Sequence, residues 1–460
     1  MDSKIISCIV TNTNLIMINI SKGLTSLFNR PTFHNSTIDG VRAIAVLMVI
    51  IGHIFFFHNS EILNGDEVFK NYATYWHLLR ADLGVDLFFV ISGFLIGSIL
   101  FKEFKKTNNI SFTSFYLRRF LRLMPVYLVA ILCGIYLFDL SNSQTAWTNV
   151  LYVNNFINIS EQFMGWCWSL AIEEQFYILI PASLLMLLFS KRKKINILLF
   201  FLLLSVVIRF ITVYAYNLFP SELYWTLPGN EGWDLSFSIL YDNLITRYGG
   251  LLVGVIAAYL YIFYNAELKL FFKSKVSLRL FYVSIVIFWV VFFRIDFIYF
   301  SEPTQYGLMI EERELNFIEK IYFATVVSIT RNLFSVASIY IVFSALFLKT
   351  TISEKINNFL SSKFFYPIAQ LSYSAYLMHE MFMLKLYPSY SIKIYELLNE
   401  NIIMALVIIS LITIILTFLS SIILYVFIER PFMEFRNSSI IKKLTLKKYE
   451  RVNAKVIEAA

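Results

Sequence analysis

The stretch IDGVRAIAVLMVIIGHIFFF, residues 38–57, decides the fold of this chain. It is long and apolar enough to cross a membrane as a helix, yet it contains Arg42 and His53. Ionisable side chains are costly inside a membrane, so by default they indicate function. Eleven residues at about 100° each bring His53 to within about 20° of the direction of Arg42, about 16 Å further along the helix. We therefore expect both side chains on one helix face, directed towards a polar interior.

The composition of the whole chain favours the same class of protein. Hydrophobic residues make up 58% of the 460 residues and charged residues 15%, whereas a soluble domain carries about 25% charged residues. The apolar runs are continuous rather than alternating, which predicts helices because lipid cannot satisfy exposed backbone groups. We expect an all-α polytopic membrane protein with about ten transmembrane helices. The runs lie near residues 38–58, 83–101, 123–139, 168–189, 195–216, 243–264, 280–300, 321–348, 366–387 and 402–428.

The distribution of Lys and Arg predicts the orientation. With the N-terminus inside, the predicted cytoplasmic segments hold 28 of the chain's 39 Lys and Arg residues, and the opposite loops 140–167 and 217–242 hold none. We therefore place both termini in the cytoplasm. This bias accounts for the net charge of +8 and the pI near 9.1, so we expect no nucleic-acid partner.

The same reasoning divides the chain into three regions. Residues 1–37 are predicted to be an arm that is cytoplasmic or lies at the membrane interface, and residues 38–432 a single transmembrane domain. Residues 433–460 are predicted to be a basic cytoplasmic tail resting on anionic lipid headgroups. The three cysteines form neither a disulfide pattern nor a metal-binding pattern, and we expect no metal site.

Asp86 lies in the second run, in the sequence GVDLFFVISGF at residues 84–94. This side chain can be interpreted as a catalytic acid, as a partner for Arg80 or for an inner arginine, or as a cap at the start of the helix. Ser92 and Gly93 in the same run are small, which predicts close packing against another helix.

Three arginines, Arg118, Arg119 and Arg122, precede the third run in the sequence FYLRRFLRLMP at residues 115–125. Arg119 and Arg122 are three residues apart, so they face one way on a helix. The planar guanidinium group suits phosphate, and this cluster therefore predicts a site for a phosphorylated ligand. A cytoplasmic anchor to lipid phosphates is the alternative.

Two adjacent acids, Glu173 and Glu174, stand at the start of the fourth run. Glu173 is four residues from Tyr177, on the same face, and we expect it to pair with Arg42 or to orient His53. A structural salt bridge is the alternative, because a buried ion pair is weak evidence for catalysis. Glu174 points about 100° away from Glu173, so we expect it to matter less.

Two further polar residues lie inside predicted spans. Arg247 precedes YGGLLVG at residues 248–254, whose small residues predict a packing face, and His379 follows LSYSAYLM at residues 371–378. A lone histidine inside a membrane is more commonly a hydrogen-bonded structural residue than a catalyst.

Six motifs in this order resemble membrane acyltransferase family three, the polytopic acetyl-CoA-dependent O-acyltransferases of bacterial envelopes. The resemblance covers about residues 37–432. Each motif is weak alone, but the set is specific. The motifs are DGVR (39–42) with His53, GVDLFFVISGF (84–94), RRFLRLMP (118–125), WSLAIEEQFY (168–177), SYSAYLMH (372–379) and ERP (429–431).

The resemblance implies transfer of an acyl group, usually acetyl, from cytoplasmic acyl-CoA to a hydroxyl of an envelope polysaccharide or glycolipid at the bacterial inner membrane. On this interpretation His53 is a general base or a transient acyl carrier, and the three arginines bind the phosphates of acetyl-CoA. Arg42, Glu173 and Asp86 join His53 in catalysis, and Tyr177, Arg247 and His379 bind substrate.

Two questions stay open at this point. Some members of the resembled family carry a C-terminal SGNH hydrolase-like domain, and this chain ends at Ala460 without one. We therefore expect a stand-alone form that transfers directly, works with a separate periplasmic transferase or forms a homo-oligomer. The alternative class is a proton-coupled secondary transporter, because such carriers also bury ionisable residues in their spans. The paired interrupted helices common in carriers are not evident here.

Overall fold

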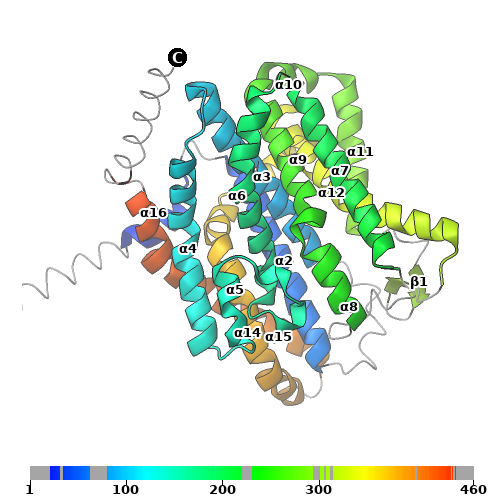
Figure 1. Ribbon diagram of the computed structural model, residues 1–460. Coiled ribbons are helices and arrows are strands. Elements are labelled where there is room, and N and C mark those ends of the chain that lie inside the picture. The colour runs from blue at the N-terminus through cyan, green and yellow to red at the C-terminus, as the bar shows by residue number, and fades with distance from the viewer. Residues whose placement is uncertain are drawn as a thin grey trace, which may run out of the picture.

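The computed structural model describes residues 21–31, 35–62, 80–191, 193–219, 231–293, 301–304, 307–310, 314–398, 401–436, 438 and 441. Figure 1 shows long helices gathered into one bundle. They are α2 (Ser36–Ile62), α3 (Ala81–Thr107), α4 (Phe112–Tyr136), α6 (Trp168–Phe189), α7 (Lys194–Ala215), α9 (Leu244–Phe263), α11 (Lys275–Phe292), α12 (Phe317–Phe347), α14 (Phe365–Leu397) and α15 (Ile402–Leu424). Between them lie α5 (Ala146–Val150), α8 (Glu231–Ser236), α10 (Asn265–Phe271) and α13 (Thr351–Leu360), and α16 (Arg430–Arg436) follows α15.

Nine helices in the described part are long and apolar enough to cross a membrane, namely α2, α3, α4, α6, α7, α9, α11, α12 and α15. The tenth predicted run, 366–387, is part of α14, a helix of 33 residues that is long enough to span but more polar than the other nine. Strands β1 (Ser301–Thr304) and β2 (Gly307–Ile310) form one small antiparallel hairpin. The prediction of an all-α polytopic membrane protein is confirmed. The side of the membrane on which the termini lie stays a prediction.

Helices α3 and α9 pack closely at the centre of the bundle because glycines face backbone. A Cβ atom on Gly93 would lie 1.9 Å from the carbonyl oxygen of Leu251, and one on Gly254 would lie 2.1 Å from that of Val90. No other residue fits at either position without moving a helix. The predicted small-residue packing faces therefore pack against each other.

Helix α2 lies between α3 and α14. A Cβ atom on Gly52 would lie 2.6 Å from the Cβ atom of Ala81 on α3, and Ile50 packs with Ala375 and Met383 of α14 in one apolar cluster. The face of α2 that carries His53 is thus brought against α14.

The last helices return to the end of the bundle where α2 and α4 begin. Leu27, in the helix formed by residues 21–28, packs with Leu371, Tyr425 and Val426. Figure 1 shows α16 beside α4. The predicted basic tail, residues 433–460, thus begins inside α16, and of this tail the structure describes 433–436, 438 and 441. The arginines of α4 lie at this same end of the bundle. His53 lies about 16 Å from Arg42 along α2, away from that end.

Candidate active site

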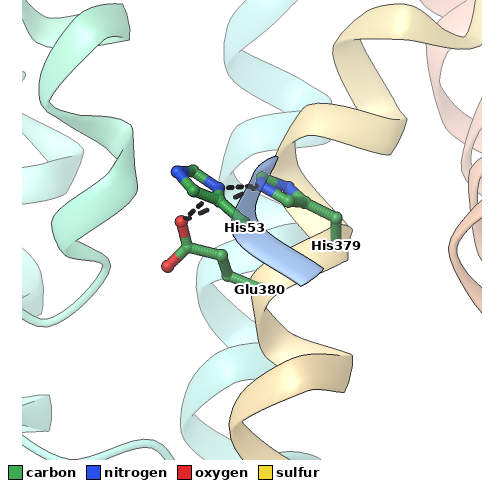
Figure 2. A group of neighbouring side chains, drawn as sticks. All are labelled: His53, His379 and Glu380. Carbon is green, nitrogen blue, oxygen red and sulfur yellow. Dashed lines mark hydrogen bonds and ion pairs between the residues drawn. The ribbon is translucent and has the colours of Figure 1, made fainter. Parts of the chain in front are cut away.

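His53 meets two side chains of α14, as Figure 2 shows. Its Nδ1 atom lies 2.8 Å from Nε2 of His379 and 2.8 Å from Oε1 of Glu380. The other ring nitrogen of His379, Nδ1, lies 2.7 Å from the carbonyl oxygen of Tyr376. These contacts join His53 on α2 to His379 on α14, two residues that are 326 positions apart in the sequence.

The hydrogen bonds fix the tautomers of both imidazoles when both are neutral. The carbonyl oxygen of Tyr376 can only accept, so Nδ1 of His379 carries the proton and Nε2 carries a lone pair. The Nδ1–H group of His53 then donates towards Nε2 of His379 and the Glu380 carboxylate. The Nε2 atom of His53 is left with its lone pair free to accept a proton.

Burial separates the three side chains by role. The His379 side chain is fully buried, whereas the side chains of His53 and Glu380 are 26% and 12% exposed. Tyr376, one turn before His379, anchors α14 to the start of α6. Its hydroxyl group donates to the carbonyl oxygen of Trp166 and accepts from Ser169 at 2.7 Å. The ring of His53 is therefore the most exposed part of a group that hydrogen bonds hold in place.

The structure corrects the expected surroundings of His53. We expected Glu173 to orient the imidazole or to pair with Arg42, but among the described residues the polar contacts to His53 come from His379 and Glu380. Glu380 is not among the site residues that we predicted from the sequence. A signal was present, because Glu380 follows His379 directly inside a predicted span, where an acid is costly.

Glu173 does not form the expected ion pair with Arg42. Its Oε2 atom accepts a hydrogen bond from the hydroxyl of Tyr177 at 2.7 Å, and Nη2 of Arg42 donates to Ser372 at 2.9 Å. Arg42 and Glu173 are close enough to interact electrostatically, but Arg119 of α4 interacts with Glu173 more strongly. The guanidinium of Arg119 lies 4.0 Å from the centre of the Tyr177 ring.

Glu174, expected to face elsewhere, also meets this arginine. Its Oε1 atom lies 3.7 Å from Nη2 of Arg119. Arg119 therefore interacts with both acids, although the two side chains leave α6 in different directions.

Arg436 of α16 joins the arginines of α4. It lies within electrostatic range of Arg118, Arg119 and Arg122, and we call these four residues the arginine cluster. The cluster has a buried counterion, Glu429, which interacts with Arg42, Arg122 and Arg436. Glu429 belongs to the ERP motif, for which we predicted no role of its own, and Arg436 is not among the predicted site residues. The cluster is a concentrated positive site at the end of the bundle where α2 begins.

Asp86 and Arg247 lie together in a separate group of charges. Asp86 contacts Arg247 at 3.0 Å and Arg331 at 2.6 Å, and Arg80 contacts Asp82 at 2.9 Å. Of the interpretations of Asp86, the partner of an inner arginine matches these contacts, although Arg80 is not that partner. The expected catalytic role of Asp86 and substrate-binding role of Arg247 have no support from contacts to the His53 group among the described residues.

Comparison with known proteins identifies the family. The model of the acyltransferase domain family Acyl_transf_3 matches residues 35–426, so the chain belongs to this family and is a multi-pass membrane protein. A Staphylococcus aureus (strain COL) protein named "Putative O-acetyltransferase SACOL0978" is 32% identical over 241 residues, 49% of this chain and 34% of that protein. O-acetyltransferase OatA of Staphylococcus aureus (strain NCTC 8325 / PS 47) is 37% identical over 162 residues, 31% of this chain and 24% of OatA.

The relatives are not confined to bacteria. Nose resistant to fluoxetine protein 6 of Caenorhabditis elegans is 26% identical over 262 residues, 49% of this chain and 31% of that protein. The matches to these three relatives thus span about a quarter to a third of their lengths. No solved structure matches the chain.

Proposed function

We propose that the chain is a membrane O-acetyltransferase that moves an acetyl group from acetyl-CoA to a hydroxyl group, with His53 at the reacting centre. The observation that carries this proposal is the hydrogen-bonded group in which Glu380 and His379 both face Nδ1 of His53. That arrangement leaves Nε2 with a free lone pair on the more exposed of the two histidines. The family match and the names of the relatives support an acyl transfer reaction.

The chemistry follows from the free Nε2 atom. As the acceptor oxygen attacks the thioester carbonyl carbon, Nε2 takes the hydroxyl proton and His53 becomes an imidazolium. When the tetrahedral intermediate collapses, the carbon–sulfur bond breaks and the leaving thiolate takes that proton. The Glu380 carboxylate stabilises the cation in between. Transient acylation of Nε2 is the second route, and it uses the same lone pair.

The arginine cluster is the proposed site for the phosphates of acetyl-CoA. Three guanidinium groups of α4 within electrostatic range of Arg436 suit a polyanionic ligand, and their planar forks match phosphate oxygens. Arg42 lies within range of Arg122, and His53 lies about 16 Å further along α2. That separation is of the same order as an extended pantetheine arm, so the donor can place its phosphates and its thioester at the two sites together. We propose that the donor enters from the cytoplasmic end, where Lys and Arg are concentrated.

The proposed acceptor is a hydroxyl of an envelope polysaccharide or a lipid-linked glycan at the bacterial inner membrane. The names of the two staphylococcal relatives support O-acetylation but do not specify the acceptor. The acetyl group goes directly to this acceptor, with a separate periplasmic transferase or a homo-oligomer as the alternative arrangements.

A reconstitution experiment tests the proposal against the transporter alternative. Purified protein in sealed proteoliposomes receives radiolabelled acetyl-CoA and an envelope glycan extract. We expect release of free CoA and label bound covalently to the glycan. Empty liposomes are the control. Accumulation of an unmodified solute driven by a proton gradient, without consumption of acetyl-CoA, would instead identify a carrier.

A further inference from the structure

We propose that His53, His379 and Glu380 form a binding site for a zinc ion, and that zinc in this site switches acetyl transfer off. The binding half of the proposal depends only on the three side chains. The inhibition half rests on the proposed function, because it requires Nε2 of His53 to act as a base. No metal-binding pattern is visible in the sequence because the ligands come from α2 and α14, two helices far apart in the chain.

The three ligand atoms are spaced for one small cation. Nδ1 of His53 lies 2.8 Å from both Nε2 of His379 and Oε1 of Glu380, and the latter two atoms lie 3.8 Å apart. Zinc bonds of about 2.0–2.2 Å in tetrahedral geometry place ligand atoms about 3.3–3.5 Å apart. Movements of about half an ångström at the ends of side chains bring all three distances into this range. Among the residues that the structure describes, this is the one group with metal-ligand spacing.

The chemical state of each ligand suits zinc. Nε2 of His379 presents a lone pair because its Nδ1–H group is held by the carbonyl of Tyr376, and metal-binding histidines use this kind of outer hydrogen bond. Glu380 supplies an oxygen ligand, and its ion pairs in the described part of the chain are with the two histidines rather than with Lys or Arg. Two nitrogens and one carboxylate leave a fourth position for water, as in catalytic zinc sites.

The ion can reach the site from one side. The side chains of His53 and Glu380 are partly exposed, whereas His379 is fully buried behind them. Zinc can therefore enter over the exposed edge while α2 and α14 stay packed. The buried ligand then holds the ion against the two reachable ones.

Zinc binding reverses the tautomer of His53. The metal takes the Nδ1 lone pair, so the single proton of the neutral ring moves through solvent to Nε2. No proton is gained or lost overall. With Nε2 protonated, His53 can no longer accept the hydroxyl proton of the acceptor, and transfer stops. The site thus has two states. Without zinc, Nδ1 of His53 carries the proton and Nε2 is an active base; with zinc on Nδ1, Nε2 carries the proton and is inactive.

Zinc binding is measured directly on the purified protein, without an activity assay. Competition against a chromophoric zinc chelator gives the affinity and the stoichiometry. We expect one zinc ion per chain at this site, with affinity at least tenfold lower in His379→Ala and in Glu380→Gln. Glu396→Gln is the matched control, because Glu396 is an exposed acid on the same helix.

The outcomes separate the site from the proposed function. A wild-type protein that binds no zinc, or variants that bind it as tightly as wild type, would overturn the site even where acetyl transfer is robust. Zinc that binds, with binding lost in His379→Ala, but that leaves acetyl transfer unchanged at saturating buffered zinc would overturn the inhibition and the role of Nε2 as a base. Inhibition that follows occupancy and is reversed by a chelator supports the whole proposal.

Discussion

Replacing Glu380 with Gln removes one negative charge from the His53 group and little else. The Gln side chain has nearly the same size, and its amide oxygen can still accept from Nδ1 of His53, which lies 2.8 Å from the carboxylate. The change thus weakens a charge-assisted hydrogen bond to a neutral one. Its effect is largest when His53 carries the acceptor proton as an imidazolium, because the carboxylate then faces a cation.

The size of the effect follows from ordinary hydrogen-bond energies. A hydrogen bond to a charged group contributes about 1.5–3 kcal/mol and a neutral one about 0.5–1.5 kcal/mol. Glu380 is 12% exposed, so solvent screens the interaction little. A loss of about 1.4 kcal/mol in the transition state lowers kcat about tenfold. KM for acetyl-CoA should stay within about twofold, since the arginine cluster lies at the other end of the membrane span.

Steady-state kinetics in proteoliposomes measure both constants for wild type, Glu380→Gln and the control Glu396→Gln. The expected pattern is a lower kcat in Glu380→Gln alone. If kcat of Glu380→Gln remains within twofold of wild type, or if the variant changes only KM, Glu380 does not support an imidazolium at His53 and the reasoning is refuted.

Three further changes test other parts of the structure. Arg119→Ala should raise KM for acetyl-CoA about tenfold or more, with partial rescue by Arg119→Lys; an unchanged KM would make this arginine a lipid anchor. Asp86→Asn leaves the buried Arg247 without its carboxylate partner, whereas Arg331 keeps Asp82 at 3.3 Å. We expect a loss of about 3–5 kcal/mol in the free energy of unfolding, seen as a lower melting temperature; wild-type melting would show that the ion pair is not structural. Burial raises the pKa of Asp242 to about 8 from an ordinary 3.8, so the folded state binds a proton that the unfolded state has lost. As the pH rises from about 4 to 8, the free energy of unfolding should therefore fall by up to about 1.4 kcal/mol per pH unit. Asp242→Asn should remove this pH dependence in melting scans, and an unaltered dependence would rule out Asp242 as its source.

Much of the fold can be predicted from the sequence because its signals are local. Each of the ten apolar runs overlaps a helix. The length and continuous hydrophobicity of a single run are enough to predict that it forms a membrane helix. Gly93 predicts close packing because only a missing side chain admits another backbone. Arg42 and His53 were predicted to share a helix face by angle alone, and the structure sets His53 against α14 and Arg42 beside the arginine cluster.

The contacts within the site depend on which helix lies opposite, and helical periodicity does not specify that. Arg42 and Glu173 have complementary charges, yet Arg119 from α4 interacts with Glu173 more strongly. Adjacent residues point about 100° apart on a helix, but both His379 and Glu380 reach Nδ1 of His53. The longer side chain of Glu380 makes up for the angle between the two residues. Cα directions alone do not predict this contact.

The most direct test of the central claim is the acetyl transfer rate of His53→Ala in proteoliposomes, with size-exclusion profile and melting temperature matched to wild type. General base catalysis contributes about 10²–10⁴-fold, so we expect the rate to fall at least about a hundredfold. His379→Ala should lose less, because Glu380 still holds the tautomer of His53. A folded His53→Ala protein that acetylates its acceptor within about tenfold of the wild-type rate would contradict the assignment of His53 as the reacting centre.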